Sequence, residues 1–229
     1  MSDLDRLFSR EEEEKVRAAV NAAEGQTSGE IVPYVVAASD TYEGALWKSA
    51  ALGALTAPLA WGILEWKLDL WGGSFGSLLG NAAGAVLRWA VPALAGAALA
   101  YGAALGLPAL RRWLIPAEVM ERRARRRAAV AFLEEEIFRT DERTGILIFL
   151  SLFERRVVVM GDEGINRRVA PEEWQGIVDG IVTGIRQERS VEALVAAIGE
   201  CGGLLQRRGV EIGPEDENEL SDELRSRES

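Results

Sequence analysis

The apolar residues of this chain follow helical spacing in some segments and strand-like runs in others. In residues 9–24 the apolar positions recur every three or four residues, and Ser9 is followed three residues later by Glu12, which predicts a capped amphipathic helix. Residues 31–38 form a β-branched run that predicts a strand. Pro33 within this run indicates an edge strand or a bulge.

The second half of the chain alternates in the same way. The predicted elements are a helix over residues 118–140, strands over 145–151 and 155–160, and helices over 171–187 and 191–207. The short connection between the two strands predicts an antiparallel hairpin. A strand, a crossover helix and another strand imply a parallel pair with a right-handed crossover. We therefore expect an α/β fold with a small, helix-covered mixed β-sheet.

Two long apolar segments interrupt this pattern. Residues 49–64 and 89–110 contain no charged side chain, and about twenty residues at 1.5 Å per residue cross the hydrocarbon core of a bilayer. We predict a transmembrane hairpin with spans over residues 46–64 and 89–110. The alternative is a pair of buried helices in a soluble domain, in which Pro58 and Pro92 would be unfavourable.

The flanks of these segments predict how the hairpin sits in the membrane. Six of the seven tryptophans lie at or near the ends of the spans, as expected for indoles at the interface. Arginines are concentrated after the second span, whereas the connecting segment carries only Lys67 and Arg88. The positive-inside rule therefore predicts a multi-pass inner-membrane protein with both termini in the cytoplasm. No signal peptide is recognisable, so the first span would act as its own insertion signal.

The sequence thus divides into four parts. The expected boundaries are 1–40 for the first part of an α/β domain, 41–113 for the transmembrane hairpin, 114–210 for the second part of the domain, and 211–229 for an acidic disordered tail.

Composition limits the chemistry. The chain contains no histidine, which excludes histidine-based catalysis and zinc–histidine sites. The single cysteine, Cys201, lies in an apolar helical pattern and is expected to be a buried structural thiol. A net charge of −10 argues against a nucleic-acid partner. Any bound metal would need oxygen ligands, so Ca²⁺ or Mg²⁺ are the candidate cofactors.

The predicted strand order brings one group of polar residues to a single end of the sheet. The candidate ligand or metal residues are Glu30, Asp141, Asp162 and Glu163, with Glu142 as a further oxygen donor and Thr140 and Arg143 in support; Glu30 and Asp162 are the principal metal candidates. The alternative is an ion-pair network that closes this end of the domain. No activated nucleophile is recognisable, so no catalytic residue is assigned.

Several short motifs occur in the order found in a known family. They are Thr27-Ser28-Gly29-Glu30-Ile31, Thr140 with Arg143-Thr144-Gly145-Ile146-Leu147, Val157 to Asp162 with Gly164-Ile165, Trp174 with Ile177-Val178, and Asn218-Glu219-Leu220. In these motifs the chain resembles the TPM-domain family, as a bacterial membrane-bound member. The resemblance implies a helix-covered mixed sheet similar to that of the thylakoid-lumen phosphatase-like proteins, and calcium binding as in some bacterial members.

The sequence favours one function and leaves an alternative open. We expect a cytoplasmic domain anchored in the lipid bilayer that acts as a non-enzymatic adaptor or assembly factor, through a membrane-protein partner or self-association. The alternative is a metal-dependent phosphatase-like hydrolase, which requires the carboxylates to converge on one point. A transporter is disfavoured because the uncharged segments 49–64 and 89–110 place no charged side chain inside the membrane.

Overall fold

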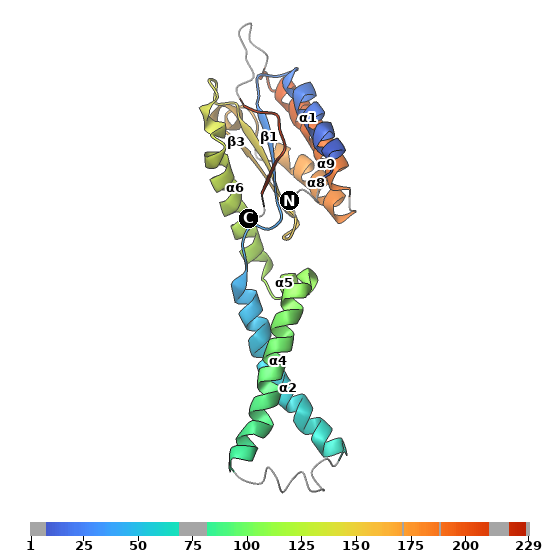
Figure 1. The fold of residues 1–229 in the computed structure, drawn as a ribbon. Coiled ribbons are helices and arrows are strands. Elements are labelled where there is room, and N and C mark those ends of the chain that lie inside the picture. The colour runs from blue at the N-terminus through green and yellow to red at the C-terminus, as the bar shows by residue number, and fades with distance from the viewer. Residues whose placement is uncertain (1–7, 69–81, 171, 188, 211–219, 228–229) are drawn as a thin grey trace. The chain divides into compact units, whose positions relative to one another are not determined.

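The chain folds into two compact units. The computed structural model describes residues 8–68, 82–170, 172–187, 189–210 and 220–227 (Figure 1). Unit 1 is formed by Met1–Thr41 together with Ala117–Ser229, and unit 2 by Tyr42–Pro116. Unit 2 is therefore an insertion in the sequence of unit 1, and each unit is described by itself.

Unit 1 is built on a mixed four-stranded sheet with the order β3-β2-β1-β4. Strands β1 (Ile31–Val36) and β2 (Ile146–Ser151) run parallel, and β3 (Arg156–Gly161) pairs with β2 in the antiparallel direction. The predicted parallel pair and the predicted hairpin are thus confirmed. Strands β1, β2 and β3 are each six residues long, as expected for β-branched runs that pack on both faces.

The fourth strand corrects two expectations. Residues 211–229 were expected to be a disordered tail, but β4 (Arg225–Arg227) pairs in parallel with β1 at Tyr34 to Val36. Residues 211–219 and 228–229 lie outside the described part of the chain. Because β4 lies beside β1, Pro33 does not mark an edge strand; it occupies the stretch of β1 that precedes the pairing with β4.

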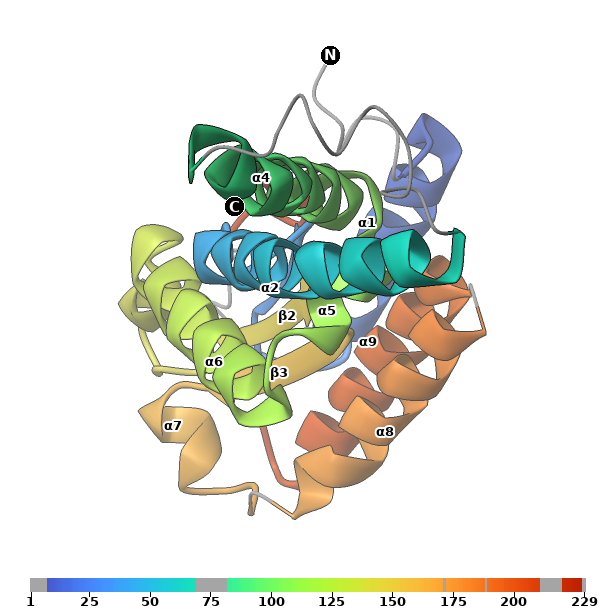
Figure 2. The same cartoon turned by 90° about the horizontal axis from the view of Figure 1, so that it is seen from below.

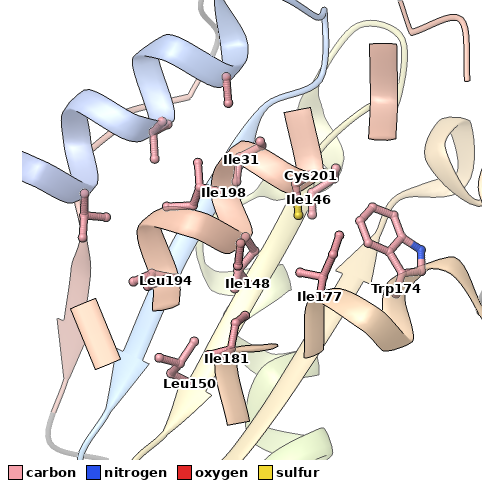
Figure 3. Close-up of a cluster of buried hydrophobic side chains, with 14 of the residues drawn as sticks. Ile31, Ile146, Ile148, Leu150, Trp174, Ile177, Ile181, Leu194, Ile198 and Cys201 are labelled. Carbon is pink, nitrogen blue, oxygen red and sulfur yellow. The ribbon is translucent and has the colours of Figure 1, made fainter. Parts of the chain in front are cut away.

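Three helices cover one face of the sheet. They are α1 (Arg10–Glu24), α8 (Glu173–Arg186) and α9 (Ser190–Arg207) (Figures 1 and 2). The expected capping box at Ser9 is present. Figure 3 shows the core beneath these helices, where Ile146, Ile148 and Leu150 of β2 meet Leu194 and Ile198 of α9.

The predicted interior position of Cys201 is confirmed within this core. Cys201 is fully buried, and its burial raises the pKa of the thiol to about 12. Trp174 is 7% exposed and belongs to the same cluster of side chains. Cys201 is therefore not available as a reactive surface thiol.

Helix α6 (Ala117–Glu134) covers the opposite face of the sheet (Figure 2). Its buried side is made of alanines at helical spacing, Ala124, Ala128 and Ala131, which let the helix approach closely. Tyr34 stacks on Phe149 beneath it, with 5.8 Å between ring centroids. The Tyr34 hydroxyl accepts a hydrogen bond of 2.8 Å from the Arg127 guanidinium, so this arginine of the basic cluster serves the fold of unit 1.

The segment after α6 differs from the predicted helix over residues 118–140. The α-helix ends at Glu134, Glu136 adopts a left-handed conformation with φ of 52°, and a short 3₁₀ helix, η2 (Ile137–Arg139), follows. Glu136 prevents the helix from continuing, because non-glycine residues in this conformation do not propagate a right-handed helix. A further short helix, α7 (Glu163–Asn166), follows β3 and was not predicted.

Unit 2 consists of helices α2 (Glu43–Leu68), α4 (Ala82–Gly106) and α5 (Pro108–Trp113). Helices α2 and α4 pack against each other at Gly53 and Gly96. A Cβ atom on Gly53 would overlap the Gly96 carbonyl, and a Cβ on Gly96 would overlap the Gly53 carbonyl and Ala57. Only glycine permits this approach of the two backbones.

Among the described residues, one helix is long and apolar enough to cross a membrane by length and composition, and this is Val86–Gly106 of α4. The predicted span over residues 89–110 extends beyond it, because Leu107 is extended and Pro108 begins the separate helix α5. Helix α2 contains the predicted span 46–64 but does not meet the same criterion. The two-span hairpin therefore stays a prediction.

Candidate functional site

The strand register brings the two principal candidate residues to the same end of the sheet. Ile31 of β1 pairs with Ile146 of β2, and Ile146 pairs with Gly161 of β3. Glu30 and Asp162 therefore lie on either side of Gly145, one strand away from it in each direction. The Ile146 amide donates to the Glu30 carbonyl at 2.7 Å.

Backbone of the loop after α6 fills the space over Gly145. A Cβ atom on Gly145 would overlap the Ile137 carbonyl oxygen, so Ile137 packs directly on this glycine. Strands two positions apart in a sheet are separated by roughly 10 Å. Glu30 and Asp162 thus share an end of the sheet, with the middle strand between them.

Asp162 is held by Arg143. The Arg143 guanidinium lies 2.8 Å from the Asp162 carboxylate, which is buried, whereas Arg143 itself is half-exposed. Arg143 also donates to the Phe138 carbonyl at 2.9 Å, and its guanidinium lies 5.9 Å from the centre of the Phe138 ring. These contacts tie the loop after α6 to the end of β3.

The threonines at this end bind backbone groups. The Thr140 hydroxyl accepts a hydrogen bond of 2.9 Å from the Thr144 amide, and the Thr144 hydroxyl donates to the Ser28 carbonyl at 2.8 Å. Thr27 donates to the Val210 carbonyl at 2.7 Å. Their side chains therefore close the loops around the sheet end rather than pointing at an open site.

The remaining candidate carboxylates lie on the surface. Glu163 is exposed and pairs with Arg167 one helical turn later, and Asp141 lies on an exposed turn. Glu142 lies 4.0 Å from Arg168. Within the described part of the chain, no three aspartate, glutamate or cysteine side chains come together as a group that could hold a metal ion.

A second carboxylate group lies beside the same strand end and was missed by sequence reasoning. Glu24, the last residue of α1, accepts a hydrogen bond of 2.7 Å from the Ile31 amide. Burial raises the pKa of Glu24 to about 8, and the neighbouring carboxylates of Glu30 and Asp222 add to this rise. Asp222 reaches Glu24 because β4 lies beside β1, which no periodicity in the tail indicates.

The opposite end of the sheet carries a buried hydrogen-bonded group. The Ser39 amide donates to Glu154 at 2.8 Å, and the hydroxyls of Ser39 and Ser151 are 2.7 Å apart. The Ser151 hydroxyl donates to the other Glu154 oxygen. This group fastens the chain after β1 to the β2–β3 turn.

The surface of unit 2 is apolar. Its large exposed side chains include Trp47, Leu55, Leu59, Trp66, Leu94, Leu99 and Trp113. The acidic side chain near the end of α2, Glu65, is buried and binds Arg88 of α4 at 2.5 and 2.9 Å. Unit 2 thus presents large apolar groups outward, and Glu65 and Arg88 form an ion pair between its two long helices.

The predicted interfacial tryptophans fall in two groups. Trp47, Trp66 and Trp113 are strongly exposed in unit 2, and Trp61 and Trp89 are 40% and 48% exposed. Trp71 and the neighbouring Phe75 lie outside the described residues. The ring of Trp47 lies 5.7 Å from that of Tyr101 on α4. Exposed tryptophans at helix ends are typical of a membrane interface.

No protein-family model and no curated protein sequence matches the chain. Among solved structures, the chain is similar to the NMR structure of the BA42 protein from the psychrophilic bacterium Bizionia argentinensis. The two share 17% sequence identity and a TM-score of 0.56, over 96% of this chain and 95% of the other. At this identity the similarity shows the fold alone: a mixed α/β protein with a small mixed sheet.

Proposed function

We propose that this protein is a membrane-anchored adaptor, in which α2 and α4 insert in the bilayer as a hairpin and unit 1 binds another protein in the cytoplasm. The observation that carries the anchor is the outward-facing apolar surface of unit 2. Soluble proteins rarely expose contiguous apolar surface of this kind. Leu94 and Leu99 of α4 are 72% and 75% exposed, in the helix whose length suits a membrane span.

The charged residues of unit 2 support the same proposal. Glu65 and Arg88 bind each other, which lowers the cost of placing either charge near lipid. Arg111 and Arg112 lie in α5 directly after α4, beside the exposed Trp113. Arginine and tryptophan at this position favour a cytoplasmic interface.

The geometry of unit 1 favours an adaptor over a metal-dependent hydrolase. A hydrolase of the alternative type needs several carboxylates to converge, whereas Asp162 binds Arg143 and Glu163 binds Arg167. Binding of Ca²⁺ or Mg²⁺ at Glu30 and Asp162 stays a prediction. Membership of the TPM-domain family, supported by the sequence motifs, is also part of the proposal.

The anchor is tested by placing a charge on the apolar surface. Leu99→Arg on α4 is compared with Leu133→Arg, a change at a 63% exposed leucine of α6 in unit 1. Arginine at the centre of a membrane helix costs about 2.5–3.5 kcal/mol, whereas exposed substitutions in water stay within about 0.5 kcal/mol.

We expect Leu99→Arg to reduce the fraction of protein that stays in membranes after alkaline extraction, and Leu133→Arg to leave it unchanged. Equal behaviour of both variants and the wild type would contradict the anchor.

A further inference from the structure

The outer side of β3 is an open edge of the sheet. The Asp162 amide donates a hydrogen bond of 2.9 Å to the Gly145 carbonyl. In an antiparallel pair, successive residues direct their backbone groups alternately toward and away from the neighbouring strand. Every second residue of β3, counted back from Asp162, therefore directs its N–H and C=O groups at β2. The backbone groups of Val157 and Val159 therefore point away from the sheet. Within the described residues, no backbone hydrogen bond joins them to another segment.

A groove of about 420 Å³ follows this edge. It is lined by Val157 and Val159 of β3, by Trp174 and Val178 of α8, and by Arg125 of α6. Since α8 and α6 cover opposite faces of the sheet (Figure 2), a hollow that touches both must lie at the edge. It therefore offers apolar contacts beside unpaired backbone groups.

This edge lacks the usual protection. Natural edge strands are shortened, bulged or interrupted by lysine or proline to prevent pairing with another chain. Strand β3 has three consecutive valines, Val157 to Val159, and carries neither proline nor lysine. One end is closed by Asn166, whose side chain donates to the Gly161 carbonyl at 2.6 Å.

The charges beside the groove specify what would bind. Arg125 and Arg156 lie 2.7 and 3.4 Å from the same carboxylate, that of Glu121, so two cations share one anion. Arg155, the residue before Arg156, is exposed as well. An added strand that ends in carboxylates beside these arginines would be electrostatically complementary.

A second copy of this chain fits the edge less well. Helices α6 and α8 both pack on β3. Because α6 packs chiefly on β3, pairing of β3 with its own copy would crowd the two α6 helices on the same face of the joined sheet. Packed helices need about 8–10 Å between their axes.

We infer that the β3 edge groove binds an extended apolar segment of a partner protein, which adds to the sheet as an antiparallel strand with acidic residues at its C-terminal end. Antiparallel addition places that end beside Arg156. Main-chain hydrogen bonds to Val157 and Val159 supply affinity, and the groove and the arginines supply specificity. The inference rests on the proposed adaptor function and gives it a binding surface.

The test uses the full chain in detergent and two fluorescent synthetic peptides. Both carry the segment Val-Thr-Val-Thr-Val, one followed by Glu-Glu and the other by Lys-Lys. Fluorescence anisotropy should show saturable binding of the Glu-Glu peptide, at least about tenfold tighter than that of the Lys-Lys peptide. No saturable binding, or equal binding of both, would overturn the inference.

Two variants separate strand addition from other modes of binding. Val159→Pro removes an outward N–H without removing a β2–β3 hydrogen bond, and proline is tolerated on edge strands. It should lower the affinity at least about tenfold, with an unchanged circular dichroism spectrum. Arg125→Glu should reverse the preference between the peptides, whereas Arg122→Glu, an exposed change on the same helix, should not.

The variants also separate failure of the inference from failure of the anchor. Val159→Pro that binds like the wild type would overturn strand addition. If Val159→Pro does not fold, the peptide preference of Arg125→Glu is the test of the inference: an unchanged preference would overturn it. If the wild type dimerises and Val159→Pro is monomeric, the partner at this edge is a second copy of the chain, and the choice of another protein is overturned. None of these outcomes depends on membrane insertion, which Leu99→Arg tests separately.

Discussion

Gly53 of α2 and Gly96 of α4 face each other so closely that a side chain on either would overlap the backbone of the other. In lipid, helices gain no hydrophobic driving force from association, so this close packing must hold the hairpin together. The contact therefore links the sequence of unit 2 to its proposed place in the bilayer.

Gly96→Val should loosen the hairpin. The Cβ of the valine would overlap Ala57 and the Gly53 carbonyl, and overpacking of this kind costs about 1–3 kcal/mol. The matched control is Gly102→Val on the same helix, where an added Cβ meets no atom within 4 Å. Thermal unfolding in detergent should show a lower midpoint for Gly96→Val than for Gly102→Val; equal midpoints would contradict the packing.

Glu24 should make the stability of unit 1 depend on pH. Its pKa is about 8 in the folded chain against an ordinary value of 4.5 for glutamate, so the folded state binds the extra proton. Stability is then highest below about pH 4.5, falls as the pH rises to about 8, and stays reduced above that.

Glu24→Gln should remove this loss of stability at high pH, because glutamine carries no charge and keeps an oxygen acceptor for the Ile31 amide. We expect it to stabilise the chain at pH 9 by an amount on the order of 1 kcal/mol, after allowing for solvent screening, and to have little effect at pH 4. Urea unfolding at both pH values measures this, with Glu13→Gln as the exposed control on the same helix. A Glu24→Gln variant less stable than wild type at pH 9 would contradict the pKa.

The Arg143–Asp162 pair should be structural. Changing Arg143 to Met leaves the buried Asp162 carboxylate without its cation, which costs about 1–3 kcal/mol. Glu163→Gln breaks the exposed pair with Arg167 and should cost less than about 1 kcal/mol. Urea unfolding of both variants compares the two. Equal stability of Arg143→Met and wild type would contradict a structural role for the pair and would favour Asp162 as a ligand-binding carboxylate.

The sequence predicted the order of elements because the patterns are strong where side chains are buried. The run over residues 31–38 and the two later strands are β-branched, and Ser9 with Glu12 marks the start of α1. Strand β4 could not be found in this way. Its three residues, Arg-Ser-Arg, have no apolar pattern, and they join the sheet through backbone pairing with β1.

Only those features of the candidate site that follow from strand order could be predicted from the sequence. Strand order placed Glu30 and Asp162 at one end of the sheet, but the packing of Ile137 on Gly145 depends on the break at Glu136. The raised pKa of Glu24 depends on burial and on Asp222, which is nearly 200 positions away in the sequence. Neither feature has a local sequence signal.

The central claim, a hairpin anchor with unit 1 in the cytoplasm, is tested most directly by thiol labelling in spheroplasts. Cys201→Ala removes the only cysteine, and Lys67→Cys or Glu200→Cys then introduces one at an exposed position of unit 2 or unit 1. A membrane-impermeant maleimide should label Lys67→Cys in intact spheroplasts and Glu200→Cys only after lysis. Labelling of Glu200→Cys before lysis, or protection of both positions until lysis, would contradict the account.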